Sequence, residues 1–216
     1  MGGSIVQGRF PGPVPPGLTV FETMRVEADG RIALWPLHRD RLRHGCALVG
    51  FPLDEDAVQA ALGAVPKGQI LRVRLAVYAV GAISVTHQPL PANPAFWRVV
   101  LSPLRLDSAD PWLGIKTSHR PVYDRARAAL PEGTDEAILL NERGEVCEGT
   151  ITNLFLRRGD RLLTPPLSCG LLPGVLRRSL IDAGRAEEAR LMPADLAAGD
   201  LFMGNALRGL IPAQLV

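Results

Sequence analysis

Lysine is the scarcest charged residue in this chain of 216 residues. Of its 24 basic side chains only Lys67 and Lys116 are lysines, and the others are arginines. Arginine supplies positive charge at a surface as well as lysine does, but it holds its proton too tightly to react as an amine. Lys116 lies in the otherwise apolar segment GIK, residues 114–116. This context favours amine chemistry over the alternative of a solvated loop residue.

Cysteine is also scarce, and neither long apolar runs nor blocks of like charge occur. The three cysteines, Cys46, Cys147 and Cys169, have no metal-like spacing, which argues against a metal site and favours reduced thiols in the cytoplasm. No stretch approaches about 18 uninterrupted apolar residues, and none resembles a secretion signal. The net charge is only +2 and the arginines are scattered. We therefore expect a cytoplasmic protein that binds neither membranes nor nucleic acid.

Turn signals and hydrophobic periodicity predict an α+β chain with ample material for a buried core. The predicted strands are residues 18–26, 31–35, 69–78, 83–87, 97–101, 136–140, a strand through Glu148, 153–156, 161–164 and, as the last one, 200–203. The predicted helices are residues 37–49, 54–64, 121–130 and 173–183. Residues 102–114 are interpreted as a connector. The strands up to residue 101 are expected to form an antiparallel sheet in a small first lobe, with a cleft between it and a second lobe.

A second informative segment is EVCEGTITNLF, residues 145–155, which places Glu148 in a strand 32 positions after Lys116. An enzyme that uses pyridoxal 5'-phosphate (PLP) needs an amine to hold the cofactor's aldehyde as a Schiff base. It also needs a carboxylate that keeps the pyridine nitrogen protonated. Lys116 and Glu148 fit these two roles. The alternative for Glu148 is an ordinary carboxylate at a strand edge.

A phosphate site is predicted at the segment GLLPGVLR, residues 170–177, where a loop opens a helix with Pro173 near its first position. The first N–H groups of a helix have no partner inside it and lie at the positive end of its dipole. Gly174, Val175 and Leu176 are therefore candidate phosphate donors. A plain structural helix start is the alternative.

These segments resemble the fold-type IV PLP enzymes, the class IV aminotransferase group, and most closely its aminodeoxychorismate lyases. The resemblance covers most of the chain. The matching segments, in family order, are FETMRV at 21–26, SPLRL at 102–106 with GIK at 114–116, the E-x4-N-L-F spacing from Glu148, LPG at 172–174, and NALRG at 205–209. The family's H-x-x-R-L pattern falls on residues 38–42. By that pattern Arg41 is the phosphate-binding arginine. The resemblance of the NALRG segment implies that Asn205 and Ala206 close the cofactor site.

The resemblance implies a fold with a small α+β N-terminal domain, residues 1–104, and a larger pseudo-barrel C-terminal domain that binds PLP, residues 105–216. It also implies a homodimer. The catalytic residue is expected to be Lys116. Arg105, Arg120 and Arg208 are the nearest arginines in sequence to the expected site segments, and they are candidates for the substrate's carboxylates.

The implied activity is that of a 4-amino-4-deoxychorismate lyase of folate biosynthesis, which releases pyruvate and forms 4-aminobenzoate. The alternatives are a class IV aminotransferase for branched-chain or D-amino acids and a catalytically silent binding protein on the same fold. The chain departs from the family at Gly17-Leu18-Thr19, where a G-D-G turn is usual. His119 and Tyr123, although close to Lys116 in sequence, are not assigned to the site.

Overall fold

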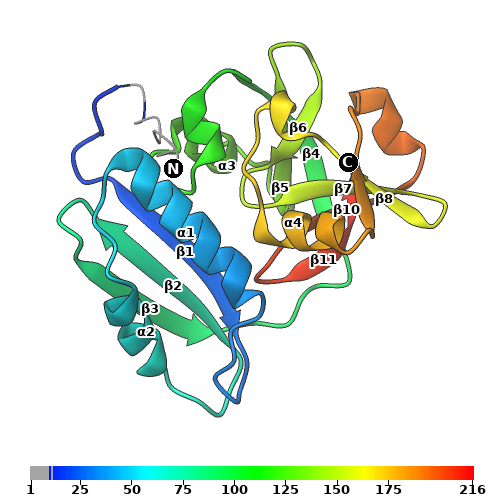
Figure 1. Cartoon of the computed structure of the whole chain (residues 1–216). Coiled ribbons are helices and arrows are strands. Elements are labelled where there is room, and N and C mark those ends of the chain that lie inside the picture. The colour runs from blue at the N-terminus through cyan, green and yellow to red at the C-terminus, as the bar shows by residue number, and fades with distance from the viewer. Residues whose placement is uncertain (1–9, 11) are drawn as a thin grey trace, which may run out of the picture. The chain divides into compact units, whose positions relative to one another are not determined.

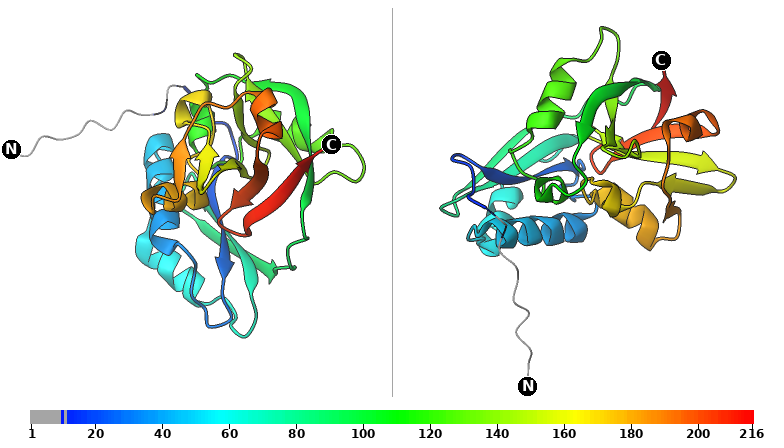
Figure 2. Two further views of the ribbon diagram at one scale, coloured as in Figure 1. Left: turned by 90° about the vertical axis from the view of Figure 1, so that its right-hand side faces the viewer. Right: turned by 90° about the horizontal axis from the view of Figure 1, so that it is seen from above.

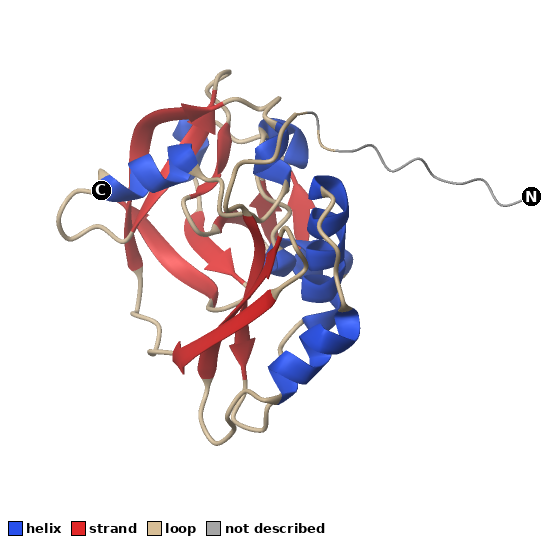
Figure 3. Cartoon of the chain, turned by 90° about the vertical axis from the view of Figure 1, so that its left-hand side faces the viewer, coloured by secondary structure: helices blue, strands red, loops and turns tan. Residues whose placement is uncertain are grey.

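The computed structural model describes residues 10 and 12–216, and each of its two compact units combines helices and strands (Figures 1 and 3). The first unit runs to Pro89 and includes Ile115–His119, whereas the second contains Leu90–Gly114 and Arg120–Val216. The domain boundary predicted after residue 104 differs from this division and falls inside strand β4 (Trp97–Leu106). The expected α+β class is confirmed.

The first unit is a three-stranded antiparallel sheet with two helices on one face (Figure 1). Its elements are β1 (Thr19–Val26), α1 (Trp35–Val49), α2 (Glu55–Gly63), β2 (Leu71–Tyr78) and β3 (Ile83–Pro89), and the strand order is β1-β2-β3. Successive side chains of a strand point to opposite faces. The helix-covered face of β1 and β2 carries buried Val20, Met24, Leu75 and Val77, together with one carboxylate, Glu22.

The helix starts of this unit show which local sequence signals predicted the structure correctly and which did not. Asp54 caps α2 as predicted, because its side chain accepts a hydrogen bond from Ala57 N at 3.0 Å. The predicted strand at residues 31–35 is wrong, since only Ile32 forms a bridge, to Val26, and α1 already begins at Trp35. Proline in the first turn of α1 favours this start.

Among the described residues, no helix is both long and apolar enough to cross a membrane.

The second unit is built on an eight-stranded sheet that closes on itself, as the expected pseudo-barrel requires. Its strand order is β10-β11-β4-β5-β6-β7-β8-β9, and β10 also pairs with β7. The further elements are α3 (Pro121–Ala128), β5 (Glu136–Asn141), β6 (Val146–Gly149), β7 (Asn153–Arg158), β8 (Arg161–Thr164), α4 (Val175–Asp182), β9 (Ala186–Glu188), β10 (Asp200–Asn205) and β11 (Gly209–Leu215), with short 3₁₀ turns at Pro111–Gly114, Leu167–Cys169 and Pro193–Ala197. The β10–β7 pairing therefore joins the two sides of the sheet.

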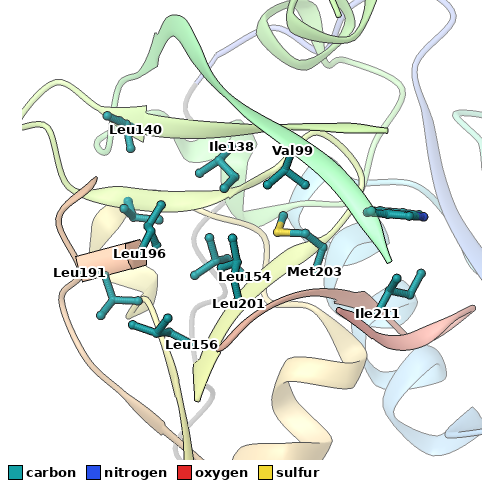
Figure 4. Close-up of a cluster of buried hydrophobic side chains, with 12 residues drawn as sticks. Val99, Ile138, Leu140, Leu154, Leu156, Leu191, Leu196, Leu201, Met203 and Ile211 are labelled. Atoms are coloured by element: carbon teal, nitrogen blue, oxygen red, sulfur yellow. The ribbon is translucent and has the colours of Figure 1, made fainter. Parts of the chain in front are cut away.

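The closed part of this sheet encloses a hydrophobic core (Figure 4). Ile138 and Leu140 of β5 and Leu154 of β7 belong to this core. The intervening residues point outward, so that Leu139 packs with α3 and Phe155 packs with α4. β5 is buried along its whole length. Because it is covered on both faces, its residues between Glu136 and Asn141 are all apolar.

Three further expectations about strands need correction. Strand β4 continues to Leu106, well into the predicted connector, and it pairs in parallel with β5 and β11 instead of joining the first antiparallel sheet. The predicted last strand is followed by β11, which forms an antiparallel hairpin with β10 (red in Figure 2). The short β9 was not predicted. The corrections for β4 and β9 concern pairing between segments that are distant in sequence, whereas β11 follows β10 through a short turn.

Candidate active site

The predicted site residues fall into two groups, one in each unit. Lys116 and Arg41 belong to the first unit, and Glu148, the start of α4 and the segment after β10 belong to the second. No cluster of three or more potential metal ligands occurs among the residues that the structure describes.

Lys116 is held on a short segment that pairs with the edge of β1. Its carbonyl oxygen accepts a hydrogen bond from Phe21 N at 3.0 Å, and Thr117 forms a bridge with Val20. The Nζ atom lies 4.8 Å from the centroid of the Phe21 ring. Lys116 is half-buried, whereas Lys67 is exposed. The structure thus gives Lys116 an ordered backbone and an aromatic neighbour, unlike a solvated loop lysine.

Arg41 joins a buried cluster on the helix-covered face of β1. Its Nε and Nη2 atoms donate to the two carboxylate oxygens of Glu22 at 2.7 and 2.6 Å, and His38 Nδ1 lies 2.7 Å from Glu22 Oε2. Burial acts to raise the pKa of Glu22, but Arg41 and then His38 outweigh it and lower that pKa to about 2. Arg41 is therefore a fixed cation and not a solvated helix residue. Glu22 thus accepts from both donors of the Nε/Nη2 edge of this guanidinium.

Glu148 lies on β6 and is almost completely buried. Its Oε1 atom accepts hydrogen bonds from Tyr123 Oη at 2.6 Å and from Leu172 N at 2.9 Å, and its Oε2 atom accepts one from Asn153 Nδ2 at 3.1 Å. These donors stabilise the charged form and hold the carboxylate in one orientation. Such a carboxylate is suited to keep a pyridine nitrogen protonated.

Tyr123 is a residue that the sequence did not assign to the site. Burial and the neighbouring charge of Glu148 raise the pKa of Tyr123 well above its ordinary value, so its hydroxyl stays protonated and donates to the carboxylate. It approaches Glu148 from α3, 25 positions earlier in the chain. No local pattern signals this contact, because it depends on how α3 packs against the barrel.

The start of α4 is arranged as the phosphate prediction requires, with one correction. Gly174 is the residue before the helix, and its carbonyl accepts the bond from Arg178 N at 2.8 Å. Pro173 therefore lies outside the helix and not near its first helical position. The N–H groups of Val175 and Leu176 are in the first turn, where the helix itself provides no acceptor. A Cβ atom on Gly174 would lie 1.7 Å from Asn153 Oδ1, so this position has room only for glycine.

A second unassigned residue, Glu136, orders the loop between β6 and β7. Its completely buried carboxylate accepts hydrogen bonds from Thr150 N at 2.9 Å, Ile151 N at 3.1 Å and Thr152 Oγ1 at 3.0 Å. Asn205 Nδ2 donates to Ile151 O at 3.2 Å. The loop thus connects the strand of Glu148 to the predicted closing segment. The sequence pattern showed Glu136 only as the start of a strand.

The closing segment is a tight turn between β10 and β11. Asn205 Oδ1 accepts hydrogen bonds from Leu207 N at 3.1 Å and Arg208 N at 3.0 Å, and Ala206 lies within the turn. The guanidinium of Arg208 donates from Nη1 to Asn93 Oδ1 at 3.1 Å. Asn205 therefore serves both the turn and the loop that contains Ile151.

The other two predicted substrate arginines have different surroundings. Arg120 donates to Thr150 O, and its guanidinium carbon lies 5.0 Å from the centroid of the Tyr123 ring. It therefore lies beside the group around Glu148. Arg105 is exposed on β4, and its Nη1 atom donates to Ser102 O at 3.0 Å. The structure brings Arg120 to the Glu148 group and places Arg105 against the backbone of its own strand.

Comparisons with known proteins agree with the geometry. The model of the family described as amino-transferase class IV matches residues 19–216. A solved structure of a putative amino-acid aminotransferase from Mesorhizobium loti is 42% identical, with a TM-score of 0.85 over 92% of this chain and 100% of the other. The 4-amino-4-deoxychorismate lyase structure from Pseudomonas aeruginosa is 26% identical, with a TM-score of 0.77 over 97% and 89% of the two chains.

Curated relatives have names of both kinds. A probable branched-chain-amino-acid aminotransferase of Thermotoga maritima is 27% identical over 90% of this chain and 76% of its own length. An aminodeoxychorismate lyase of Bacillus subtilis is 39% identical, over 36% of this chain and 28% of its own length. The expected family and the fold-type IV architecture are confirmed. Because enzymes of this family are PLP-dependent, the expected cofactor is confirmed as well.

The residues present fit this cofactor. PLP offers a phosphate, a basic ring nitrogen and an aldehyde. The second unit provides first-turn N–H groups at Val175 and Leu176 for the phosphate, and the anchored carboxylate of Glu148 for the ring nitrogen. The first unit provides the amine of Lys116 and the guanidinium of Arg41. The donor set thus contains a partner for each of the three groups.

Proposed function

The chain belongs to the amino-transferase class IV family, and on that premise we propose that it is a PLP-dependent 4-amino-4-deoxychorismate lyase. It would release pyruvate from its substrate and form 4-aminobenzoate. The observation that carries this choice is the position of Arg120 beside the Glu148 group, through Thr150 O and the Tyr123 ring. A substrate with two carboxylates needs cations in the site, and arginine matches a carboxylate with paired donors.

The roles of the remaining residues follow from their chemistry. When bound, PLP supplies an electron sink for the bond broken at the amine-bearing carbon. In the proposal, Lys116 holds the cofactor and then removes the proton from that carbon as a general base. Glu148 keeps the ring nitrogen protonated, with Tyr123 and Asn153 fixing its orientation. Arg41 and the start of α4 bind the phosphate.

A second candidate function is that of a class IV aminotransferase. It is favoured by the 42% identity to the Mesorhizobium loti protein, which extends over that whole chain. Both reactions begin with removal of the same proton, so Lys116 and Glu148 serve either one. They differ in what happens next, since a lyase eliminates pyruvate whereas an aminotransferase releases a keto acid and transfers the amine to a keto-acid acceptor. A homodimer located in the cytoplasm is part of the same proposal.

The two reactions can be separated in one experiment. Purified protein with PLP is incubated in parallel with 4-amino-4-deoxychorismate, and with branched-chain and D-amino acids plus 2-oxoglutarate. Equal amounts of 4-aminobenzoate and pyruvate, formed without a keto-acid acceptor, would support the lyase. Keto acids derived from the added amino acids, formed only when 2-oxoglutarate is present, would support the aminotransferase. Lys116→Ala should abolish either activity and Lys67→Ala neither, while a parent protein that turns over no substrate would leave only a binding role.

A further inference from the structure

Glu136, the first residue of β5, places a completely buried carboxylate beside the β6–β7 loop, residues 150–152. Its Oε1 atom accepts hydrogen bonds from Thr150 N at 2.9 Å and from Thr150 Oγ1. Its Oε2 atom accepts from Ile151 N at 3.1 Å and from Thr152 Oγ1 at 3.0 Å. Both oxygens act as acceptors, as in an ionised carboxylate, and a buried charge is stable only with such partners. Glu136 therefore fixes the backbone and the side chains of this loop together.

The loop determines how two residues of the candidate site face each other. Glu148 and Asn153 are opposite partners in the register of β6 and β7, on either side of the loop. Gly149 N donates to Thr152 O at 2.8 Å and closes the turn. Asn153 Nδ2 then donates to Glu148 Oε2 at 3.1 Å. The position of the Asn153 amide relative to Glu148 thus depends on the loop that Glu136 holds.

Glu136 also acts on Glu148 from a second side, through α3. Arg127 of α3 places Nη1 3.4 Å from Glu136 Oε1 and 3.2 Å from Thr150 Oγ1. Tyr123 lies four positions earlier on the same helix, and residues with this spacing share one helix face. Its hydroxyl donates to Glu148 Oε1 at 2.6 Å. The face of α3 that carries Tyr123 is therefore attached to the barrel at Glu136 as well.

We propose that Glu136 is a positioning residue for the cofactor's ring nitrogen, because it fixes the orientation of the Glu148 carboxylate through the β6–β7 loop and through α3. This inference rests on the proposed role of Glu148. Asn153 and Tyr123, which both donate to Glu148, belong to the segments that Glu136 holds. A carboxylate that turns away from the ring stabilises the protonated nitrogen less, because both the hydrogen bond and the charge attraction weaken with distance. The alternative is that Glu136 only stabilises the fold.

The test uses protein loaded with PLP that carries a ¹⁵N label in its ring. Nuclear magnetic resonance of this nitrogen reports how far the ring is protonated, PLP titration measures affinity, and urea unfolding measures stability. Glu136→Gln keeps the size of the side chain, but its NH₂ group meets a donor of the loop instead of accepting from it. Glu145→Gln is the matched control. Glu145 is another buried carboxylate, and it accepts from Asn141 Nδ2 at 2.8 Å at the opposite end of β5.

We expect the nitrogen signal of Glu136→Gln to move part of the way from the parent value to that of Glu148→Gln. PLP affinity should fall about tenfold. Glu145→Gln should keep the parent signal even where it is equally destabilised. In the Glu148→Gln background, Glu136→Gln should cause no further change in the signal, because no carboxylate is left to position. Thr152→Val removes one donor to Glu136 and should cause the same shift to a smaller extent.

The inference is overturned if Glu136→Gln keeps the parent signal and a PLP affinity within about twofold of the parent, however much its stability falls. An equal shift in Glu145→Gln would also overturn it, since the effect would then follow from any loss of stability. If Glu136→Gln does not fold, Thr152→Val decides by the same criterion.

The outcome is separable from the roles on which it rests. If Glu148→Gln leaves the nitrogen signal unchanged, the premise about Glu148 fails and the inference fails with it. If Glu148→Gln shifts the signal and Glu136→Gln does not, the role of Glu148 stands and that of Glu136 fails. Neither result depends on whether the protein is a lyase or an aminotransferase, because no substrate is present in these measurements.

Discussion

Gly174→Ala should disturb both the phosphate loop and the anchoring of Glu148 through one side chain. The backbone at Gly174 is extended, with φ −66° and ψ 140°, so the substitution introduces no backbone strain. The new methyl carbon would instead lie 1.7 Å from Asn153 Oδ1. The Asn153 amide cannot rotate away without losing hydrogen bonds, because its Nδ2 atom donates to Glu148 Oε2 and to Leu172 O, both at 3.1 Å.

The magnitude follows from these contacts. Forcing an extra methyl group into a packed interior costs about 1–3 kcal/mol. Displacing the Asn153 amide also removes a hydrogen bond to a buried carboxylate, a contact worth about 1.5–3 kcal/mol. We therefore expect Gly174→Ala to lower the free energy of unfolding by about 1–3 kcal/mol or more. It should also weaken PLP binding by about tenfold, because Glu148 loses one of its hydrogen-bond donors.

Urea unfolding and PLP titration measure the two effects, and a double-mutant cycle tests their cause. In an Asn153→Ala background the clash is absent, so Gly174→Ala should cost less than about 0.5 kcal/mol more. Gly63→Ala is the control, since a Cβ at Gly63, the last residue of α2, meets nothing within 4 Å. Additive costs of Gly174→Ala and Asn153→Ala would refute this reasoning, as would a single variant as stable as the Gly63→Ala control.

Four other predictions concern charged groups. Borohydride reduction followed by peptide mapping should place the PLP adduct on Lys116, and an adduct on Lys67 would contradict the assignment. Glu148→Gln should still bind PLP but lose most of its turnover, because the ring nitrogen loses its anionic partner; unchanged turnover would exclude that role. Arg41→Ala should keep its secondary structure yet bind PLP about one to two decades more weakly on dialysis, and undiminished affinity would remove Arg41 from the phosphate site. Because Glu22 has a folded-state pKa of about 2, lowered from 4.5, its stabilisation is fully present above that ordinary value and is lost as the pH falls through about 2. The loss should approach about 3 kcal/mol in urea unfolding of the parent, and a Glu22→Gln variant with the same acid dependence would contradict it.

The sequence alone determined the features that depend on local chemistry. The apolar alternation of β1, the cap at Asp54 and the continuous apolar segment of β5 arise from residues that are close together in the chain. The reactive groups were also visible locally, since Lys116 stands out among the arginines and Glu148 lies in a strand with a recognisable spacing. Such features are set by backbone geometry and by side-chain type over a few residues.

Only the tertiary structure decided which distant residues share a face or a carboxylate. The pairing of β10 with β7 closes the barrel, and the parallel pairing of β11 with β4 completes it; neither has a sequence period that announces it. Tyr123 reaches Glu148 across 25 positions, and Glu136 orders a loop 14–16 positions away. Arg74 meets the Phe21 ring because strand register, and not proximity in sequence, sets the neighbours of a side chain in a sheet.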